Sequence, residues 1–307
     1  MKFLITGAHG DIAQSIFRIL RSSYKNSIID GTDLEISGPS EFLFNKIHKV
    51  NYPSNQNYLR YIKKISNNYQ IIIPTTESEI IFFSKNLKKF KDNSILINTP
   101  EIINTFSHQL KTYTFLKKKN FSVPSFCLEL SDIKKFSNIF FLKKKFGHGN
   151  QGYKIIDSQK EFKKLDKLKK DDWIIQEFLD GNYKEYTCAV TQLGDFRDVI
   201  ILNRRLNKGY TYFAEEVNNL ALRNTLLELA KKINLNGSIN VQLKIKKKKY
   251  AIFEINPRLS STVMMRHILG FKDCMWWIDY ILNNKLPKHH YKIKNRRLLK
   301  FFDEKYV

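Results

Sequence analysis

The sequence has few cysteines and no long hydrophobic run. Only three of its 307 residues are cysteines, Cys127, Cys188 and Cys274. An odd, widely spaced set fits neither a disulfide framework nor a zinc site, and a reducing cytoplasm is the simplest location. No apolar run approaches the ~20 residues that span a bilayer. The N-terminal residues also lack the apolar core and cleavage site of a secretory signal. We therefore expect a cytoplasmic protein with no membrane partner.

Acidic residues are scarce relative to basic ones. The chain has 53 Lys and Arg against 29 Asp and Glu, a formal net charge of +24. Such an excess makes a nucleic-acid binder one alternative. However, the excess is mostly scattered lysine, and there is no arginine-rich, aromatic-interleaved stretch or recognisable nucleic-acid module. We expect no dedicated nucleic-acid binding, although the positive field favours an anionic ligand.

The first part of the chain alternates between strand and helix patterns. Residues 2–6 (KFLIT) form a short apolar run, a glycine turn follows, and the next apolar residues fall at helical spacing. Further buried-strand patterns occur at residues 27–30, 70–73 and 94–97. This alternation predicts a parallel, Rossmann-like sheet over residues 1–98. The loop from Gly7 to Gly10, with Asp30 downstream, leaves open a dinucleotide site or a plain tight turn.

A second glycine loop, Gly147-x-Gly149-x-x-Gly152, follows a strand pattern at residues 139–143. Glycines let backbone N–H groups approach phosphate oxygens closely, and a neighbouring lysine adds positive charge. Residues 153–156 again have a strand pattern, so the loop is a flap between strands. It is not a P-loop, which needs Gly-Lys-Ser/Thr. An ordinary hairpin is the alternative.

Residues 250–258 (YAIFEINPR) contain the most informative polar side chains. Residues two apart in a strand share a face, so Glu254 and Asn256 point the same way while Phe253 and Ile255 face a core. A carboxylate beside an amide carbonyl offers hard oxygen ligands suited to Mg²⁺. A polar outer face on an edge strand is the alternative.

Two neighbours extend this set. Gln242 alternates with apolar residues in the preceding strand of a predicted hairpin, over residues 239–245 and 250–255, and we expect it opposite the same face. Arg258 lies two residues beyond Asn256, where a guanidinium suits a phosphate or acyl-phosphate oxygen.

In this order, the motifs resemble those of the ATP-grasp superfamily, most closely its carbamoyl-phosphate-synthase large-subunit branch. They are Lys111 in a helix, Lys143 before the glycine flap, Gln176-Glu177-Phe178-Leu179, Glu185-Tyr186-Thr187, Gln242 and Glu254-Ile255-Asn256-Pro257-Arg258. The resemblance covers nearly the whole chain. It implies an α/β protein with an N-terminal Rossmann-like (pre-ATP-grasp) domain followed by a two-lobed α+β ATP-grasp domain. The implied boundaries are residues 1–98, a lobe with the flap at 99–179, and a C-terminal lobe with the magnesium site at 180–307.

The resemblance also implies ATP and Mg²⁺ as cofactors, with roles for single residues. The two lysines would contact phosphates, the glycines would close over them, residues 176–179 would line the adenine pocket, and the glutamate at 185 would accept from the ribose. The implied nucleotide-binding residues are Lys111, Lys143, Gly149, Gly152, Gln176, Glu177, Leu179 and Glu185. The implied Mg²⁺ ligands are Gln242, Glu254 and Asn256. The implied catalytic residues are Arg258, Lys143 and Asn256.

Two positions depart from the family pattern. Leu110 replaces the usual acid before the first lysine, and Lys144 replaces the usual proline after the second. Lys144 and Lys145 therefore compete with Lys143 for the phosphate role. Arg204 and Arg205 are further candidates for phosphate contact, with a solvated strand end as the alternative.

The implied activity is ATP-dependent ligation of a small carboxylate, an amino acid, peptide or sugar acid, to an amine or ammonia through an acyl phosphate. We expect Ser260, Ser261 and Arg266 to shape the acceptor pocket together with the N-terminal domain and its turn at Thr75–Glu79. A carboxyphosphate-forming carboxylase of the same fold and a non-catalytic ATP-binding protein are the alternatives. A homodimer is common in the family. Neither the acid nor the amine is specified by the sequence.

Overall fold

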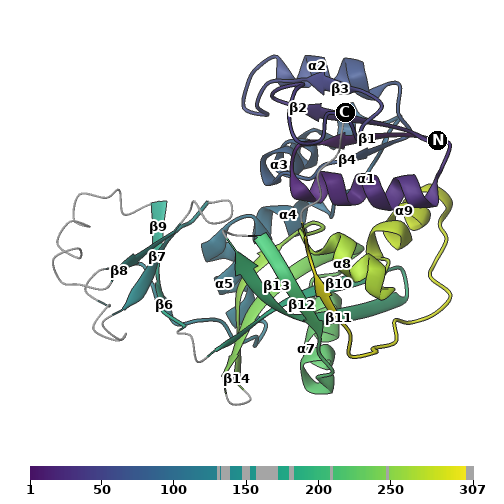
Figure 1. Cartoon of the computed structure of the whole chain (residues 1–307). Coiled ribbons are helices and arrows are strands. Elements are labelled where there is room, and N and C mark those ends of the chain that lie inside the picture. Colours follow the sequence, from purple (N-terminus) through teal and green to yellow (C-terminus); the bar gives the residue numbers. More distant parts are fainter. Residues whose placement is uncertain are drawn as a thin grey trace.

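The computed structural model describes residues 1–129, 132, 139–146, 153–156, 172–179, 183–207, 210–246 and 249–301. These residues form sheets of five, six and four strands. In Figure 1 the five-stranded sheet lies above the six-stranded sheet, and the four-stranded sheet stands to one side. A parallel N-terminal sheet followed by two antiparallel ones confirms the predicted fold class. No helix in the described ranges has the length and apolar content needed to cross a membrane.

The N-terminal sheet is parallel, with the strand order β3-β2-β1-β4-β5. Its strands are β1 (Lys2–Thr6), β2 (Ile28–Asp33), β3 (Ile47–Lys49), β4 (Ile71–Ile73) and β5 (Ser94–Ile95). Its helices are α1 (Asp11–Ser23), α2 (Tyr58–Ser66) and α3 (Glu77–Asn86), followed by a short 3₁₀ turn at Leu87–Lys89. The predicted alternation is confirmed, although β3, with the sequence IHK, is too short to show a pattern.

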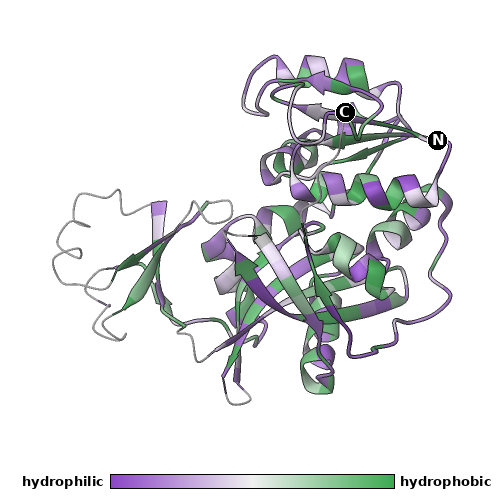
Figure 2. Ribbon diagram, viewed as in Figure 1, coloured by the Kyte–Doolittle hydropathy of each residue, from purple (hydrophilic) through white to green (hydrophobic). Residues whose placement is uncertain are grey.

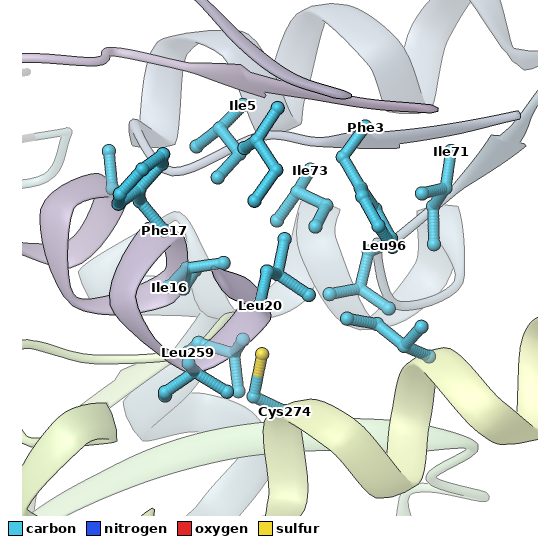
Figure 3. Close-up of a cluster of buried hydrophobic side chains, with 14 of the residues drawn as sticks. Phe3, Ile5, Ile16, Phe17, Leu20, Ile71, Ile73, Leu96, Leu259 and Cys274 are labelled. Carbon is cyan, nitrogen blue, oxygen red and sulfur yellow. The ribbon is translucent and has the colours of Figure 1, made fainter. Parts of the chain in front are cut away.

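Helix α1 joins this sheet to the C-terminal lobe. Figure 2 shows α1 and α2 with alternating hydrophilic and hydrophobic bands, as expected for helices buried on one face. In Figure 3, Ile16, Phe17 and Leu20 of α1 lie between the sheet residues and Leu259 and Cys274. All five are buried, so one hydrophobic core spans the N-terminal domain and the C-terminal lobe.

The four-stranded sheet is antiparallel, with the order β6-β9-β7-β8. It contains β6 (Phe126–Cys127), β7 (Phe140–Lys144), β8 (Tyr153–Ile156) and β9 (Trp173–Glu177). The pairing of β7 with β8 confirms a strand on each side of the predicted flap. The flap, with Gly149 and Gly152, lies outside the described residues.

The six-stranded sheet has the order β14-β13-β10-β11-β12-β15. Its strands are β10 (Lys184–Leu193), β11 (Phe196–Asn207), β12 (Tyr210–Glu216), β13 (Gly237–Lys246), β14 (Lys249–Asn256) and β15 (Arg297–Leu299). The helices around it are α4 (Pro100–Phe106), α5 (Gln109–Lys118), α7 (Leu220–Lys232), α8 (Val263–Leu269) and α9 (Asp273–Asn283). The predicted hairpin of β13 and β14 is confirmed.

The two faces of this sheet are covered differently. Apolar residues of α4, α5 and α7 pack on one face, whereas residues of α8 and the following loop cover part of the other. Helices α4 and α5 therefore pack with the six-stranded sheet, while the boundaries at residues 98 and 179 stay a prediction. The remainder of the second face carries polar side chains.

Candidate functional site

A row of polar side chains crosses β10, β11, β13 and β14 on one face of the sheet. The Nε and Nη2 groups of Arg204 donate to Oε1 of Glu185 at 2.9 and 2.7 Å, and Nη2 also donates to Oε1 of Gln242 at 2.7 Å. Nε2 of Gln242 donates to Oε1 of Glu254 at 3.3 Å, and Nδ2 of Asn256 donates to the same oxygen at 2.8 Å. Hydrogen bonds therefore join all five side chains, which we call the polar row.

Strand β14 is irregular where it meets the polar row. Glu254 and Asn256 share a face as predicted, but Ile252 and Ile255 are both buried in the core, which strict alternation forbids. The register with β13 shifts here, leaving Phe253 as the extra residue of a β-bulge. The prediction that Phe253 faces the core is therefore wrong: its side chain is only half-buried.

The carbonyl oxygen of Phe253 accepts hydrogen bonds from three side chains. Gln109 Nε2 donates at 2.8 Å and the Tyr113 hydroxyl at 3.0 Å, both from α5. Lys143 Nζ donates from β7 at 3.3 Å. A bulge leaves its extra residue out of the regular ladder, so this carbonyl is free to bind side chains. It connects the four-stranded sheet to the end of β14.

Of the competing lysines, Lys143 faces the polar row. Besides its bond to the Phe253 carbonyl, its ammonium lies 5.5 Å from the centre of the Phe253 ring. Lys144 is exposed, with its ammonium 5.7 Å from the centre of the Trp173 ring. Burial lowers the pKa of Lys143, while Glu254 and Glu185 raise it. The lysine is thus close to both carboxylates without a direct ion pair.

The predicted adenine residues lie at the end of β9 and just beyond it. Gln176 is buried, and its Oε1 accepts from the Tyr113 hydroxyl at 2.5 Å. A carboxylate oxygen of Glu177 accepts from the backbone N–H that precedes β6, at 3.0 Å. The carbonyl of Leu179 accepts from Nζ of Lys244 on β13 at 2.9 Å. These bonds tie the end of the four-stranded sheet to α5 and to the six-stranded sheet.

Arg258 lies between the polar row and the N-terminal domain. Its Nη1 donates to the carbonyl of the next residue at 2.9 Å, and its Nε is buried without a hydrogen-bond partner among the described residues. Burial lowers its pKa, while Glu77, Glu254 and Asp11 raise it. Because Glu77 and Asp11 begin α3 and α1, the carboxylates near this guanidinium come from the N-terminal domain as well as from β14.

Lys111 is not hydrogen-bonded to the polar row. It is exposed on α5, and its Nζ donates to Oδ1 of Asn104 at 2.8 Å.

The expectation that Arg266 and Ser260 line an acceptor pocket is wrong. Arg266 is 1% exposed, and its guanidinium donates to both carboxylate oxygens of Asp273 and to the hydroxyls of Ser260 and Thr262. A buried arginine needs its donors satisfied within the protein. These donors are used inside the C-terminal lobe, so the cluster supports the fold.

In the first glycine loop, His9 is hydrogen-bonded to side chains of the N-terminal domain. The His9 N–H donates to the Asp33 carboxylate at 2.8 Å, and the His9 ring hydrogen-bonds to Ser40 at 2.8 Å. Asp30, the candidate ribose acid, is buried and accepts from the Tyr69 hydroxyl. This arrangement favours the plain structural turn over a dinucleotide site.

The oxygen atoms of Glu254 and Asn256 suit a hard cation that is also bound by phosphates. Among the residues that the structure describes, no group of three or more His, Cys, Asp or Glu could hold a metal ion. Mg²⁺ commonly binds to one or two carboxylates together with substrate phosphates, rather than in an all-protein cage. One carboxylate beside one amide therefore fits Mg²⁺ that shares its coordination with a phosphate chain.

Comparison with known proteins shows which family and which folds the chain is similar to. Residues 169–300 match the family described as ATP-grasp in the biosynthetic pathway with Ter operon. The structure of an N5-carboxyaminoimidazole ribonucleotide synthetase in complex with ADP has a TM-score of 0.73 and 14% identity, covering 95% of this chain and 78% of that chain. The chain has the ATP-grasp fold. Biotin carboxylase from Campylobacter jejuni gives a TM-score of 0.72 at 14% identity, over 93% of this chain and 72% of that chain.

Two curated relatives come from mycoplasmas. The uncharacterized protein MG011 homolog of Mycoplasma pneumoniae is 28% identical over 131 residues, 42% of this chain and 44% of the relative. The uncharacterized protein MG011 of Mycoplasma genitalium is 32% identical over 99 residues, 32% of this chain and 34% of the relative. The chain thus spans less than half the length of the curated relatives it matches.

We predict that Tyr113→Phe lowers the free energy of unfolding by about 1–3 kcal/mol, because it removes the donor to the buried Gln176 oxygen. Urea unfolding followed by circular dichroism measures the change. Tyr250→Phe is the matched control, since the hydroxyl of half-buried Tyr250 makes no hydrogen bond to the described residues. Equal losses in the two variants would contradict the role of Tyr113 as a tie between α5 and β9.

Proposed function

We propose that the chain is an ATP- and Mg²⁺-dependent ligase. It activates a small carboxylate as an acyl phosphate and joins it to an amine or ammonia. The observation that carries this proposal is the polar row, with Lys143 at one side and Arg258 beyond its end. Together they form a series of charges of alternating sign from Lys143 of β7 to Arg258, which lies near carboxylates of the N-terminal domain.

The nucleotide would lie between the four-stranded and six-stranded sheets. Residues 176–179 connect these sheets and would contact the adenine, while Glu185 would accept from the ribose hydroxyls. Lys143 would exchange its long bond to the Phe253 carbonyl for a phosphate oxygen. A phosphate is the stronger partner for an ammonium because the bond joins two charges. Lys111, with Gly149 and Gly152 of the flap, would contact the phosphates as the resemblance implies.

Glu254 and Asn256 would hold the Mg²⁺. Bound there, the cation would neutralise charge on the phosphate oxygens during transfer. Gln242, expected as a third ligand, has its carbonyl oxygen on Arg204 and its amide nitrogen near Glu254. We therefore assign Gln242 to orienting the Glu254 carboxylate.

The reaction needs positioning and charge more than a protein nucleophile. A carboxylate oxygen of the acceptor attacks the γ-phosphorus of ATP, the bond to the bridging oxygen breaks, and ADP leaves. Arg258, between Glu254 and the N-terminal domain, would steady the acceptor carboxylate and the transferred phosphoryl group. The amine then attacks the acyl carbon and loses a proton, the carbon–oxygen bond to phosphate breaks, and phosphate is released.

Trapping with hydroxylamine tests the proposed function. Wild-type protein incubated with ATP, Mg²⁺, hydroxylamine and a panel of small acids should form an acyl hydroxamate only when ATP is present. The Arg258→Ala variant should lose hydroxamate formation because it removes the cation beside the acceptor. ADP release stimulated by bicarbonate alone would favour the carboxylase, whereas ATP binding without turnover on any acid would favour the non-catalytic alternative.

Lys143 and Lys144 form a matched pair for the nucleotide site. We predict that Lys143→Met weakens ATP binding about tenfold or more, the loss of one charge-assisted hydrogen bond, whereas Lys144→Met changes it little. Isothermal titration calorimetry with ATP and Mg²⁺ measures both. A larger loss in Lys144→Met would mean that the wrong lysine has been assigned to the phosphates.

A further inference from the structure

Arg204 lies at the centre of the polar row. Its side chain is 9% exposed and that of Glu185 is 25% exposed. Removing these charges from water is costly, and a buried ion pair often stabilises a fold no more than well-packed apolar residues would. Stability alone is therefore a weak reason for an arginine at this position.

The geometry fixes the orientation of Glu185. The Nε and Nη2 donors of Arg204 both bind Oε1 of Glu185, at 2.9 and 2.7 Å. Within the described part of the chain, Oε2 accepts no hydrogen bond. One oxygen is thus held by the guanidinium, and the other is left for a donor from outside the protein.

The same guanidinium fixes the orientation of the Gln242 amide. Arginine has donors and no acceptor, so the group that faces Nη2 at 2.7 Å must be the Gln242 carbonyl oxygen. The amide nitrogen of Gln242 is then turned to Glu254, where it donates at 3.3 Å. The reverse orientation would place N–H groups against N–H groups and a carbonyl oxygen against a carboxylate.

We propose that Arg204 is a positioning residue that aims Glu185 at the ribose hydroxyls of the nucleotide and turns the Gln242 amide toward Glu254. This inference rests on the proposed function, since it takes a nucleotide to lie beside Glu185. One arginine thereby connects recognition of the sugar to the carboxylate proposed to hold the cation. The motifs that carry the ATP-grasp resemblance do not include it.

The chain offers a control one residue away. Arg205 lies next in β11, so it points to the opposite face of the sheet, where its guanidinium is 5.0 Å from the centre of the Phe213 ring. It is exposed and does not belong to the polar row. Arg205→Met removes the same charge from the same strand without changing Glu185 or Gln242.

The experiment compares ATP with 2′,3′-dideoxy-ATP, which lacks the hydroxyls that Glu185 would accept. Calorimetry without Mg²⁺ gives both affinities for wild type, Arg204→Met, Arg204→Lys, Arg205→Met and Glu185→Gln. Wild type and Arg205→Met should prefer ATP by about ten- to hundredfold, the range for hydrogen bonds to a charged group. Arg204→Met and Glu185→Gln should lose most of this preference while keeping their affinity for the dideoxy nucleotide.

The variants also separate positioning from a structural role. Arg204→Lys keeps the charge but not the planar fork, so its preference for ATP should be intermediate. If Arg204→Met does not fold, Arg204→Lys is the variant whose preference is compared with that of wild type. A structural role would weaken both nucleotides equally and leave their ratio unchanged, which would overturn the proposal. The proposal would also be overturned if Arg204→Met kept the full wild-type preference for ATP over the dideoxy nucleotide, or if wild type showed no such preference. Failure of the wild type to bind either nucleotide would instead reject the proposed function.

Discussion

The carbonyl oxygen of Phe253 is the point at which three parts of the chain meet. It accepts from Gln109 and Tyr113 of α5 and from Lys143 of β7, and it can do so because the bulge in β14 takes it out of the strand ladder. Without the bulge, strict alternation would put Glu254 on the core face together with Ile252, two residues earlier. The irregularity therefore sets both the connection between the sheets and the direction of the proposed cation ligands.

The charges beside this carbonyl alternate in sign within a strongly basic protein. Lys143 lies near Glu254 and Glu185, Arg204 is bonded to Glu185, and Arg258 follows Glu254. Half-buried charges and amides are costly unless each has a partner, and a satisfied network is held in one arrangement before any ligand binds. Such preorganisation suits a reaction in which two anions must approach each other.

The layout of the fold was predictable because its strands and helices have clear apolar periods. The first strand and the β13–β14 hairpin both lie where the sequence predicts them. The shared face of Glu254 and Asn256 was predictable for the same reason. The bulge was not, since nothing in the apolar pattern of YAIFEIN distinguishes an extra residue from a regular strand. The pocket role expected for Arg266 was wrong because its ion-pair partner, Asp273, lies in a separate helix and could not be paired with it from the sequence.

The central claim is that Glu254 and Asn256 hold a cation that also binds the phosphates of a nucleotide. Calorimetric titration of ATP, with and without Mg²⁺, tests this claim directly in wild type and in a Glu254→Gln, Asn256→Leu double variant. The account predicts that Mg²⁺ tightens ATP binding to wild type, and that the variant binds ATP alone as wild type does but gains nothing from Mg²⁺. An undiminished gain in the variant would contradict the account.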